Sequence, residues 1–324
     1  MTRIARIAAA AAFVFIVLIV VPIAFAFAHR GDLYYTLSSV ALLSIASAGV
    51  WLTFYIGRIN IGQGAYALIG GYVSAVLVTT YGLSFWLSLP IAGLFCALVS
   101  VLVGVPILRL RGVYFAMVTL VLTEVARLAA LALPVTNGAK GITSIPAPGP
   151  ISLFGLTIVP GFDTFAERNV AFYVLSVVMM ILCFAGLYRL VNSRLGQLFA
   201  ALRQNEELAS SMGLNVPALR VLAYAISSFL GGVGGAIFVA IAQSIYPSSF
   251  TVDDSVRFML NCFLGGLGYV FGPMLGTLVL YFGWDLLFQT GQYQLLIYSG
   301  VMIILMLALP NGLMSLRGPA RRER

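Results

Sequence analysis

The polar side chains best suited to bind a solute lie in one glycine-rich segment, GRINIGQGAY, at residues 57–66. Asn60 and Gln63 are uncharged amides, and Tyr66 follows three residues later. Uncharged amides beside accessible glycine backbone suit a neutral or zwitterionic solute. The segment therefore predicts solute contacts at Asn60, Gln63 and Tyr66. The alternative is that the amides only cap the start of a helix.

Charged side chains inside apolar stretches are costly to bury and mark further candidate sites. Glu124 and Arg127 are three residues apart, so they can pair on one face of a helix. The alternative is that Glu124 contacts the solute directly. Asp285 stands alone near the end of an apolar stretch, and we expect its side chain to reach the membrane interface.

Residues for enzyme chemistry or metal binding are scarce. His29 is the only histidine, and the only lysine, Lys140, is followed by Gly141, so the chain has no GxxxxGK[ST] phosphate loop. The three cysteines stand alone in apolar runs: Cys96, Cys183 and Cys262. The sequence therefore predicts no catalytic residue, no metal site and no ATP bound by this chain.

The composition places these residues in a membrane. Of the 324 residues, 61% are hydrophobic and only 9% are charged, whereas soluble domains carry about 25% charged residues. We therefore expect an all-α, polytopic transmembrane helical bundle forming a single domain over residues 1–324. The net charge of +8 then reports topology and not nucleic-acid binding.

About ten apolar stretches are long enough to cross roughly 30 Å of hydrocarbon. They are residues 7–28, 33–56, 61–81, 84–108, 113–133, 170–190, 217–242, 255–271, 272–289 and 293–310. A polar, glycine-rich turn opens 61–81, and Gly272-Pro273 divides 255–289, so either segment could be a broken or re-entrant helix. We expect 1–34 to be a retained first span and an outer turn, because 7–28 exceeds the about 7–15 apolar residues of a cleavable signal.

The basic residues orient the chain. If the chain crosses the membrane ten times, most Arg residues fall on the same side of the membrane as the N-terminus. The positive-inside rule therefore predicts that the N- and C-termini are cytoplasmic. Residues 315–324 then form a basic cytoplasmic tail. The long, proline-rich loop 134–169 falls on the outer side, and the hydrophilic loop 191–216 on the inner side.

Loop 191–216 is also predicted to be helical. Its apolar residues recur at helical spacing, with charged residues on other faces. Gly213 is placed to end this helix, and Pro217 to open the next span. Such an amphipathic helix can lie on lipid headgroups or enter a groove of a partner protein.

Small residues four apart predict close packing of membrane helices. The candidate packing positions are Gly231, Gly235, Gly268, Gly272 and Gly276.

Ordered stretches of this chain resemble the M-type membrane subunit of branched-chain amino acid ABC importers, in the hydrophobic and polar amino acid and amide uptake family. They are GRINIGQGAYALIGGY at 57–72, PILRLRGVYFAMVTL at 106–120 with TNGAKGITSIP at 136–146, SRLGQLFAALRQNEELASSMGLNV at 193–216, FLGGLGYVFGPMLGTLVL at 263–280 and PNGLM at 310–314. The resemblance runs from about residue 35 to 317. Gln63 stands where this family usually has His, a change that removes a titratable group from the implied solute pathway. Val113 stands where an acidic residue or proline is common.

The resemblance implies that 191–216 is a cytoplasmic coupling loop. In this family a Glu-Ala-Ala sequence, with Gly six residues after the Glu, docks into an ATPase subunit. Glu207-Leu208-Ala209 with Gly213 matches that spacing, with Leu208 replacing one Ala. The implied coupling residues are Arg203, Glu206, Glu207, Ala209 and Gly213.

The resemblance also implies the partners and the mechanism. A periplasmic binding protein would deliver solute to loop 134–169, and a second homologous permease would complete a heterodimer in the bacterial inner membrane. Two separate ATPase subunits, holding ATP and Mg, would drive alternating access. Urea, short amides or small carboxylates, including aromatic acids, are alternative solutes to branched-chain amino acids.

Two other classes are disfavoured by the residues themselves. A stand-alone channel or ion-coupled carrier would usually keep several acidic or His residues at mid-membrane, and this chain offers only Glu124. A membrane enzyme would need clustered acids, His or Cys near an interface.

Overall fold

The structure, a computed structural model, describes residues 31–110, 112–153, 156–159, 162, 168–287, 293–309 and 312–317. The α-helices are α3 (Gly31–Tyr55), α4 (Gln63–Thr79), α5 (Phe85–Ile107), α6 (Val113–Ala132), α7 (Arg168–Val191), α8 (Arg194–Gln204), α9 (Glu206–Ser211), α10 (Val216–Ala242), α11 (Val252–Gly265), α12 (Gly272–Leu286) and α13 (Gln294–Ala308). Short 3₁₀ turns are η2 (Pro134–Thr136), η3 (Gly138–Lys140) and η6 (Leu313–Arg317). The predicted first span at 7–28 lies outside the described residues.

Five of the described helices are long and apolar enough to cross a membrane, namely α3, α5, α6, α7 and α10. Their ends agree with the predicted spans to within about two residues, because glycine, proline and charged residues bound each apolar run. The chain is therefore a polytopic, mainly helical membrane protein. Helix α4 is also apolar, and its 17 residues are at the lower limit for a membrane span.

The C-terminal third forms shorter helices than predicted. Helices α11, α12 and α13 have 14, 15 and 15 residues, fewer than the about 20 needed to cross hydrocarbon. The expected break in 255–289 is present, since α11 ends at Gly265 and α12 starts at Gly272. Pro273 lies in the first turn of α12, where its missing N–H costs no helical hydrogen bond.

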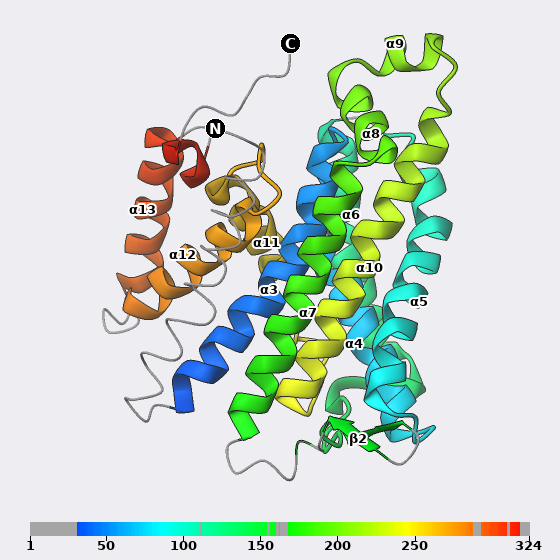
Figure 1. Cartoon of the computed structure of the whole chain (residues 1–324), viewed down its shortest axis with the longest axis vertical. Helices are drawn as coiled ribbons and strands as arrows, with labels where there is room; N and C mark the ends of the chain where they lie inside the picture. Colours follow the sequence, from blue (N-terminus) through cyan, green and yellow to red (C-terminus); the bar gives the residue numbers. More distant parts are fainter. Residues whose placement is uncertain are drawn as a thin grey trace.

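A small β-hairpin, which the sequence did not predict, lies in loop 134–169 of the otherwise helical chain. Strands β1 (Ile151–Leu153) and β2 (Leu156–Val159) pair antiparallel. Ile142 also forms an isolated antiparallel bridge with Ile245, which ties this loop to the α10–α11 connection. The hairpin and helices α8–α9 lie at opposite ends of the molecule (Figure 1).

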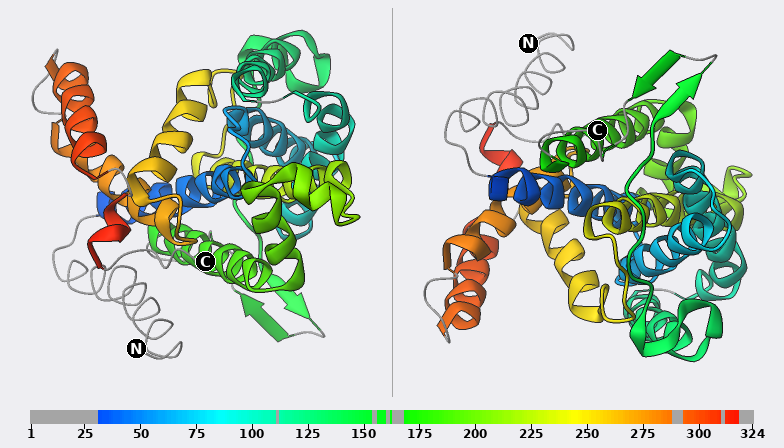
Figure 2. Two further views of the ribbon diagram at one scale, coloured as in Figure 1. Left: turned by 90° about the horizontal axis from the view of Figure 1, so that it is seen from above. Right: turned by 90° about the horizontal axis from the view of Figure 1, so that it is seen from below.

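Helix α10 lies at the centre of the bundle and packs against α3, α4 and α5, while α12 and α13 lie to one side of α3 (Figure 2). Glycines allow its backbone to approach α4 closely. A side chain at Gly235 would overlap the Ala67 carbonyl, and one at Gly70 would overlap the backbone of Gly232. These contacts fix the position of α4, and so the position of the polar segment 57–66 that leads into it.

Glycine also sets the packing of α11 against α12. A side chain at Gly276 would overlap the Asn261 carbonyl, and one at Gly272 the Gly266 carbonyl. Gly268, by contrast, is exposed in the turn between the two helices and not at a helix interface.

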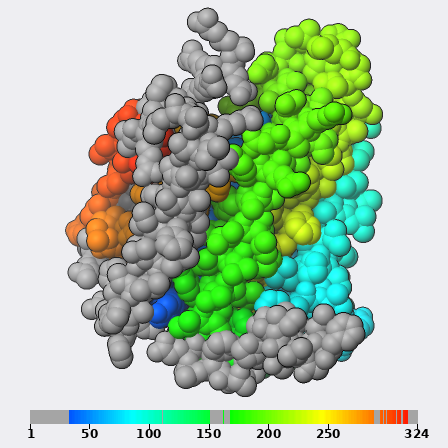
Figure 3. Space-filling model, viewed as in Figure 1, coloured from blue at the N-terminus to red at the C-terminus, as the bar shows by residue number. Residues whose placement is uncertain are grey.

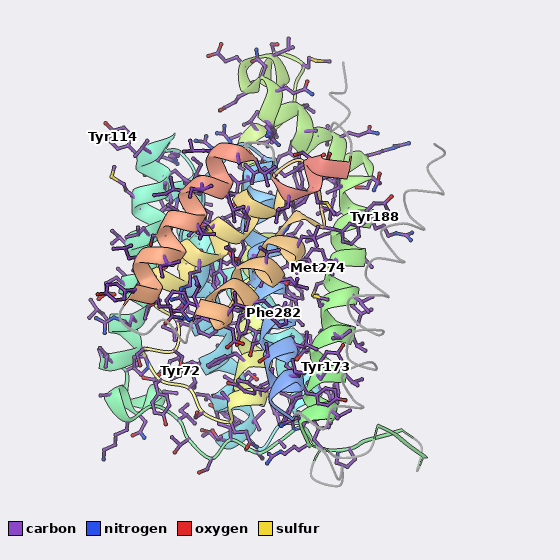
Figure 4. All side chains as sticks on the ribbon, turned by 90° about the vertical axis from the view of Figure 1, so that its left-hand side faces the viewer. Tyr72, Tyr114, Tyr173, Tyr188, Met274 and Phe282 are labelled. Atoms are coloured by element: carbon purple, nitrogen blue, oxygen red, sulfur yellow. The ribbon has the colours of Figure 1, made fainter. Side chains whose placement is uncertain are left out.

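Tyrosines occur toward both ends of the long helices. Tyr114 on α6 and Tyr188 on α7 lie toward the α8–α9 end, and Tyr173 on α7 lies toward the other (Figure 4). Tyr114 is 69% exposed, as aromatic side chains at a membrane interface commonly are, whereas Tyr173 is buried in the core.

Candidate functional site

Helices α8 and α9 project beyond the ends of the long helices (Figure 3). Asn205 begins α9, with its Oδ1 accepting a hydrogen bond from the Leu208 N–H at 3.0 Å. Gly213 has φ +83°, and the Leu214 N–H donates to the Ala209 carbonyl at 3.2 Å. This is a Schellman ending, which favours glycine at its left-handed position. The predicted helix end at Gly213 is confirmed.

The predicted coupling residues face in two directions. Arg203, Glu207 and Gly213 are exposed, whereas Ala209 is buried. Ala209 packs in a small apolar cluster, which fixes α9 to the start of α10. The buried members of that cluster are Leu202, Ala209 and Val216.

Two large apolar side chains are exposed at the end of α9: Leu208 within the helix and Met212, its C-cap residue. Leu208 is 59% exposed and Met212 is 77% exposed, and they are four residues apart, so they share one helix face. Large exposed apolar side chains that gather at a projecting tip are typical of contacts with a protein or a membrane. The sequence interpretation did not single out Met212, although its spacing from Leu208 was a usable signal.

Glu206 does not share this outward face. Its carboxylate forms an ion pair with Arg220 at the start of α10, and a longer one, at 3.8 Å, with Arg58 before α4. Arg58 and Arg220 are 5% and 8% exposed. The sequence interpretation used both arginines only as topology signals, because nothing local in the sequence joins either of them to Glu206.

Arg58 belongs to the irregular segment 56–62, which begins with a turn at Gly57 and connects α3 with α4. Its Nη1 donates to the Leu110 carbonyl, between α5 and α6, at 2.7 Å. The segment then runs back into the bundle, where the Ile61 N–H donates to Thr119 Oγ1 of α6 at 3.1 Å. Irregular backbone is tolerated at this depth because protein groups satisfy its hydrogen bonds. The polar, glycine-rich turn that the sequence predicts at the start of 61–81 is present, and α4 begins after it at Gln63; a broken or re-entrant helix over 61–81 stays a prediction.

The structure brings Asn60 and Gln63 together with no exposed surface. Asn60 Oδ1 accepts from the Gly62 N–H at 2.9 Å, and Asn60 Nδ2 donates to Gln63 Oε1 at 3.4 Å. Gln63 Nε2 donates to the Ser227 carbonyl of α10 at 2.9 Å. Ser227 Oγ in turn donates to the Gly49 carbonyl of α3 at 2.7 Å. The Gln63 amide of α4 is therefore linked to α10 directly and to α3 through Ser227.

Gln63 occupies space that glycines leave open on both neighbouring helices. A Cβ at Gly231 would lie 2.8 Å from Gln63 Nε2, and a side chain at Gly49 would overlap the same amide. Gly49 lies six residues before the end of α3, which is about 9 Å along the axis. Helix α4 thus begins inside the bundle and not at its end.

A second set of polar contacts surrounds the start of α4. The Gly64 N–H donates to Ser255 Oγ of α11 at 3.0 Å, and Ser255 Oγ lies 3.1 Å from Thr123 Oγ1 of α6. Tyr66 is also fully buried, with its hydroxyl donating to that of Tyr224 at 3.0 Å. The assignment of Asn60, Gln63 and Tyr66 to a solute pathway stays a prediction.

Glu124 lies near the middle of α6 and forms a bidentate pair with Arg127. Arg127 Nε donates to Glu124 Oε2 at 2.9 Å, and Arg127 Nη2 to Oε1 at 2.5 Å. The Glu124 side chain remains 42% exposed and the Arg127 side chain 31% exposed. The predicted pairing is confirmed, but the structure does not bring Glu124 into the buried Asn60–Gln63–Tyr66 group.

A cavity of about 150 Å³ lies at the hairpin end, between α3, α7 and α10. Its polar lining includes Tyr35, Ser38 and Arg168, none of which the sequence interpretation selected. Arg168 lies over the ring of Phe172 at 5.6 Å. The cavity contains none of the predicted pathway residues.

Comparison with known proteins places this architecture in a family. The family model described as "Branched-chain amino acid transport system / permease component" matches residues 33–310. The chain belongs to this family of permease components. No solved structure matches the chain.

Individual relatives agree with the family match. The chain is 34% identical over 279 residues to the high-affinity branched-chain amino acid transport system permease protein LivM of Escherichia coli K12, covering 81% of this chain and 65% of LivM. It is 26% identical over 244 residues to a probable LivH permease of Methanocaldococcus jannaschii, covering 74% and 75% of the two chains. It is 30% identical over 138 residues to the ribose import permease RbsC of E. coli K12, covering 40% and 43%.

Proposed function

We propose that the chain is the permease subunit of an ATP-binding-cassette importer that moves branched-chain or related amino acids by alternating access. The observation that carries the proposal is the projecting helix α9, with Leu208 and Met212 exposed on one face, in a chain of the permease family. The chain spans about two thirds of the LivM relatives, 65% of their length, so their named activity supports the proposal by analogy.

The proposed contact for an ATPase subunit is the tip of α9. Leu208 and Met212 would enter an apolar groove, while the exposed Arg203 and Glu207 would meet polar groups at its rim. A short helix that inserts this way can transmit the motion of a groove to the bundle. ATP and Mg would be held by two such ATPase partners, because this chain has no phosphate loop.

The proposed contact for a second permease is the outer face of α6. Its exposed apolar residues are Val113, Met117, Val121, Val125 and Leu128. The half-exposed Glu124–Arg127 pair lies along the same helix. A charged pair facing hydrocarbon is costly, which favours a protein or water-filled surface here. We place the solute pathway of a heterodimer on this face, with Glu124 beside it.

Asn60, Gln63 and Tyr66 would contact solute only in another state of the transport cycle, since they are fully buried in this one. Their position at the start of α4 suits that role, because transporter sites commonly form where a membrane helix is interrupted.

The remaining proposals concern topology. An even number of crossings of the bacterial inner membrane, with both termini in the cytoplasm, would put α8–α9 on the cytoplasmic side. The hairpin loop at the opposite end would then receive a periplasmic binding protein.

The solute is the least constrained part of the proposal. LivM and LivH are named for branched-chain amino acids, but the partial match to a ribose permease shows that sequence similarity of this kind extends across solutes. Urea, short amides and small carboxylates, including aromatic acids, are the alternatives. A stand-alone channel or carrier is the alternative from another class.

Co-expression with neighbouring genes tests the proposal. The chain would be purified by its own tag and the co-purifying subunits identified. We expect ATPase subunits and a second permease, with ATP hydrolysis stimulated by a solute-loaded binding protein. A homo-oligomer that passes solute without ATP would support the channel instead.

A further inference from the structure

Glu206 and Glu207 are adjacent in the sequence but lie in different surroundings. Glu207 is exposed on α9, where a partner can reach it. The Glu206 side chain is 26% exposed and ion-paired to Arg220 and Arg58. The two glutamates therefore cannot have the same role in a contact with an ATPase.

The ion-paired group joins three parts of the chain at one carboxylate. Glu206 comes from α9, Arg220 from the start of α10, and Arg58 from the segment 56–62. Arg58 also donates to the Leu110 carbonyl at 2.7 Å. A movement of α9 relative to the bundle must either carry the guanidinium groups with it or break these ion pairs.

Segment 56–62 continues this chain of contacts into the bundle. Asn60, two residues beyond Arg58, is hydrogen-bonded to Gln63, and Gln63 is bonded to Ser227 of α10. Because the Ile61 and Gly62 N–H groups of this short segment are hydrogen-bonded to Thr119 and Asn60, we expect a displacement of Arg58 to be passed along the backbone to the first turn of α4. Glu207, by contrast, is exposed on α9.

We propose that Glu206 and Arg58 are positioning residues that transmit the motion of α9 to the start of α4, whereas Glu207 serves only the outer contact of α9. The inference rests on the proposed function, because it needs an ATPase partner to move α9. Contacts in one state do not by themselves establish coupling, so the test must measure coupling directly.

The experiment uses the complete complex in proteoliposomes, and measures the solute moved per ATP hydrolysed together with the amount of ATPase that co-purifies. The variants are Glu206→Gln, Arg58→Gln and the double variant, with Arg189→Gln as a matched control at the end of α7, where Arg189 is exposed. We expect each single variant to retain the ATPase subunits but to lower solute per ATP on the order of tenfold, the usual size of a coupling between sites.

The double variant separates a shared role from two independent ones. If Glu206 and Arg58 act through each other, the double variant is no worse than the worse single one. Fully multiplicative losses would overturn the proposal, as would a wild-type ratio in Arg58→Gln. Glu207→Gln should show the opposite pattern, with less co-purified ATPase and an unchanged ratio in the complexes that remain.

Arg58→Lys covers the case in which Arg58→Gln fails to assemble. Lysine keeps the charge but not the planar group that donates to the Leu110 carbonyl while a second nitrogen lies 3.8 Å from the Glu206 carboxylate, so an assembled Arg58→Lys complex should have a lowered ratio. A wild-type ratio in that variant would assign Arg58 to folding alone and overturn the inference. If the wild-type complex itself shows no ATP-driven uptake, the proposed function fails, and this outcome is distinct from the others.

Discussion

Replacing Gly235 with alanine tests the close contact between α4 and α10. The new Cβ would overlap the Ala67 carbonyl oxygen and lie 2.7 Å from its carbon and 2.9 Å from the Gly71 nitrogen. These are backbone atoms, so the overlap can be relieved only by moving α4 as a whole. Overpacking of this kind costs about 1–3 kcal/mol.

The control is Gly186→Ala on α7, where a Cβ would meet nothing within 4 Å. Alanine gains about 1 kcal/mol of helix propensity over glycine at either site, so the difference between the two variants isolates the overlap. We expect Gly235→Ala to be less stable than Gly186→Ala by about 1–3 kcal/mol.

The assay measures the apparent melting temperature of each variant in detergent. Its readout is the fraction of protein that remains monodisperse after heating at a fixed rate. Equal melting temperatures for the two variants would refute the contact. Gly276→Ala should resemble Gly235→Ala, because its Cβ would overlap the Asn261 carbonyl.

Three further predictions concern the proposed contacts. Gly213→Ala should cost roughly 1–2 kcal/mol at the left-handed end of α9 and reduce the ATPase recovered by affinity purification; unchanged recovery would show that this ending is not needed. Leu208→Ser with Met212→Ser should weaken ATPase binding on the order of tenfold or more while leaving the melting temperature unchanged, since both side chains are exposed; unaltered binding would remove them from the contact. Glu124→Gln should lower uptake without loss of co-purified ATPase, because it leaves Arg127 unpaired beside the proposed pathway, and wild-type uptake would reduce the pair to a structural role.

Features that depend on neighbouring residues were predictable from the sequence. The ends of α5, α6 and α10 follow from the lengths of apolar runs and the residues that bound them. The end of α9 follows from Gly213, because a left-handed residue favours glycine. The Glu124–Arg127 pair follows from a spacing of three residues on a helix.

Features that depend on contacts between distant segments were not predictable. The partners of Glu206 come from segments whose approach is decided by the packing of α4 against α10. The depth at which α4 begins depends on Gly49 and Gly231, which leave room for the Gln63 amide. Gly268 has the same spacing as Gly272 and Gly276, yet it lies in a turn, because spacing alone does not show where a helix ends.

ATP-driven leucine uptake is the most direct test of the proposed function. The purified complex would be reconstituted in proteoliposomes with its binding protein outside and ATP inside, the side on which we place α8–α9. We predict that labelled leucine, or the solute found in the binding protein, accumulates above its outside concentration only with ATP and binding protein present. Equilibration of solute by this chain alone, unaffected by ATP, would contradict the importer and favour a channel.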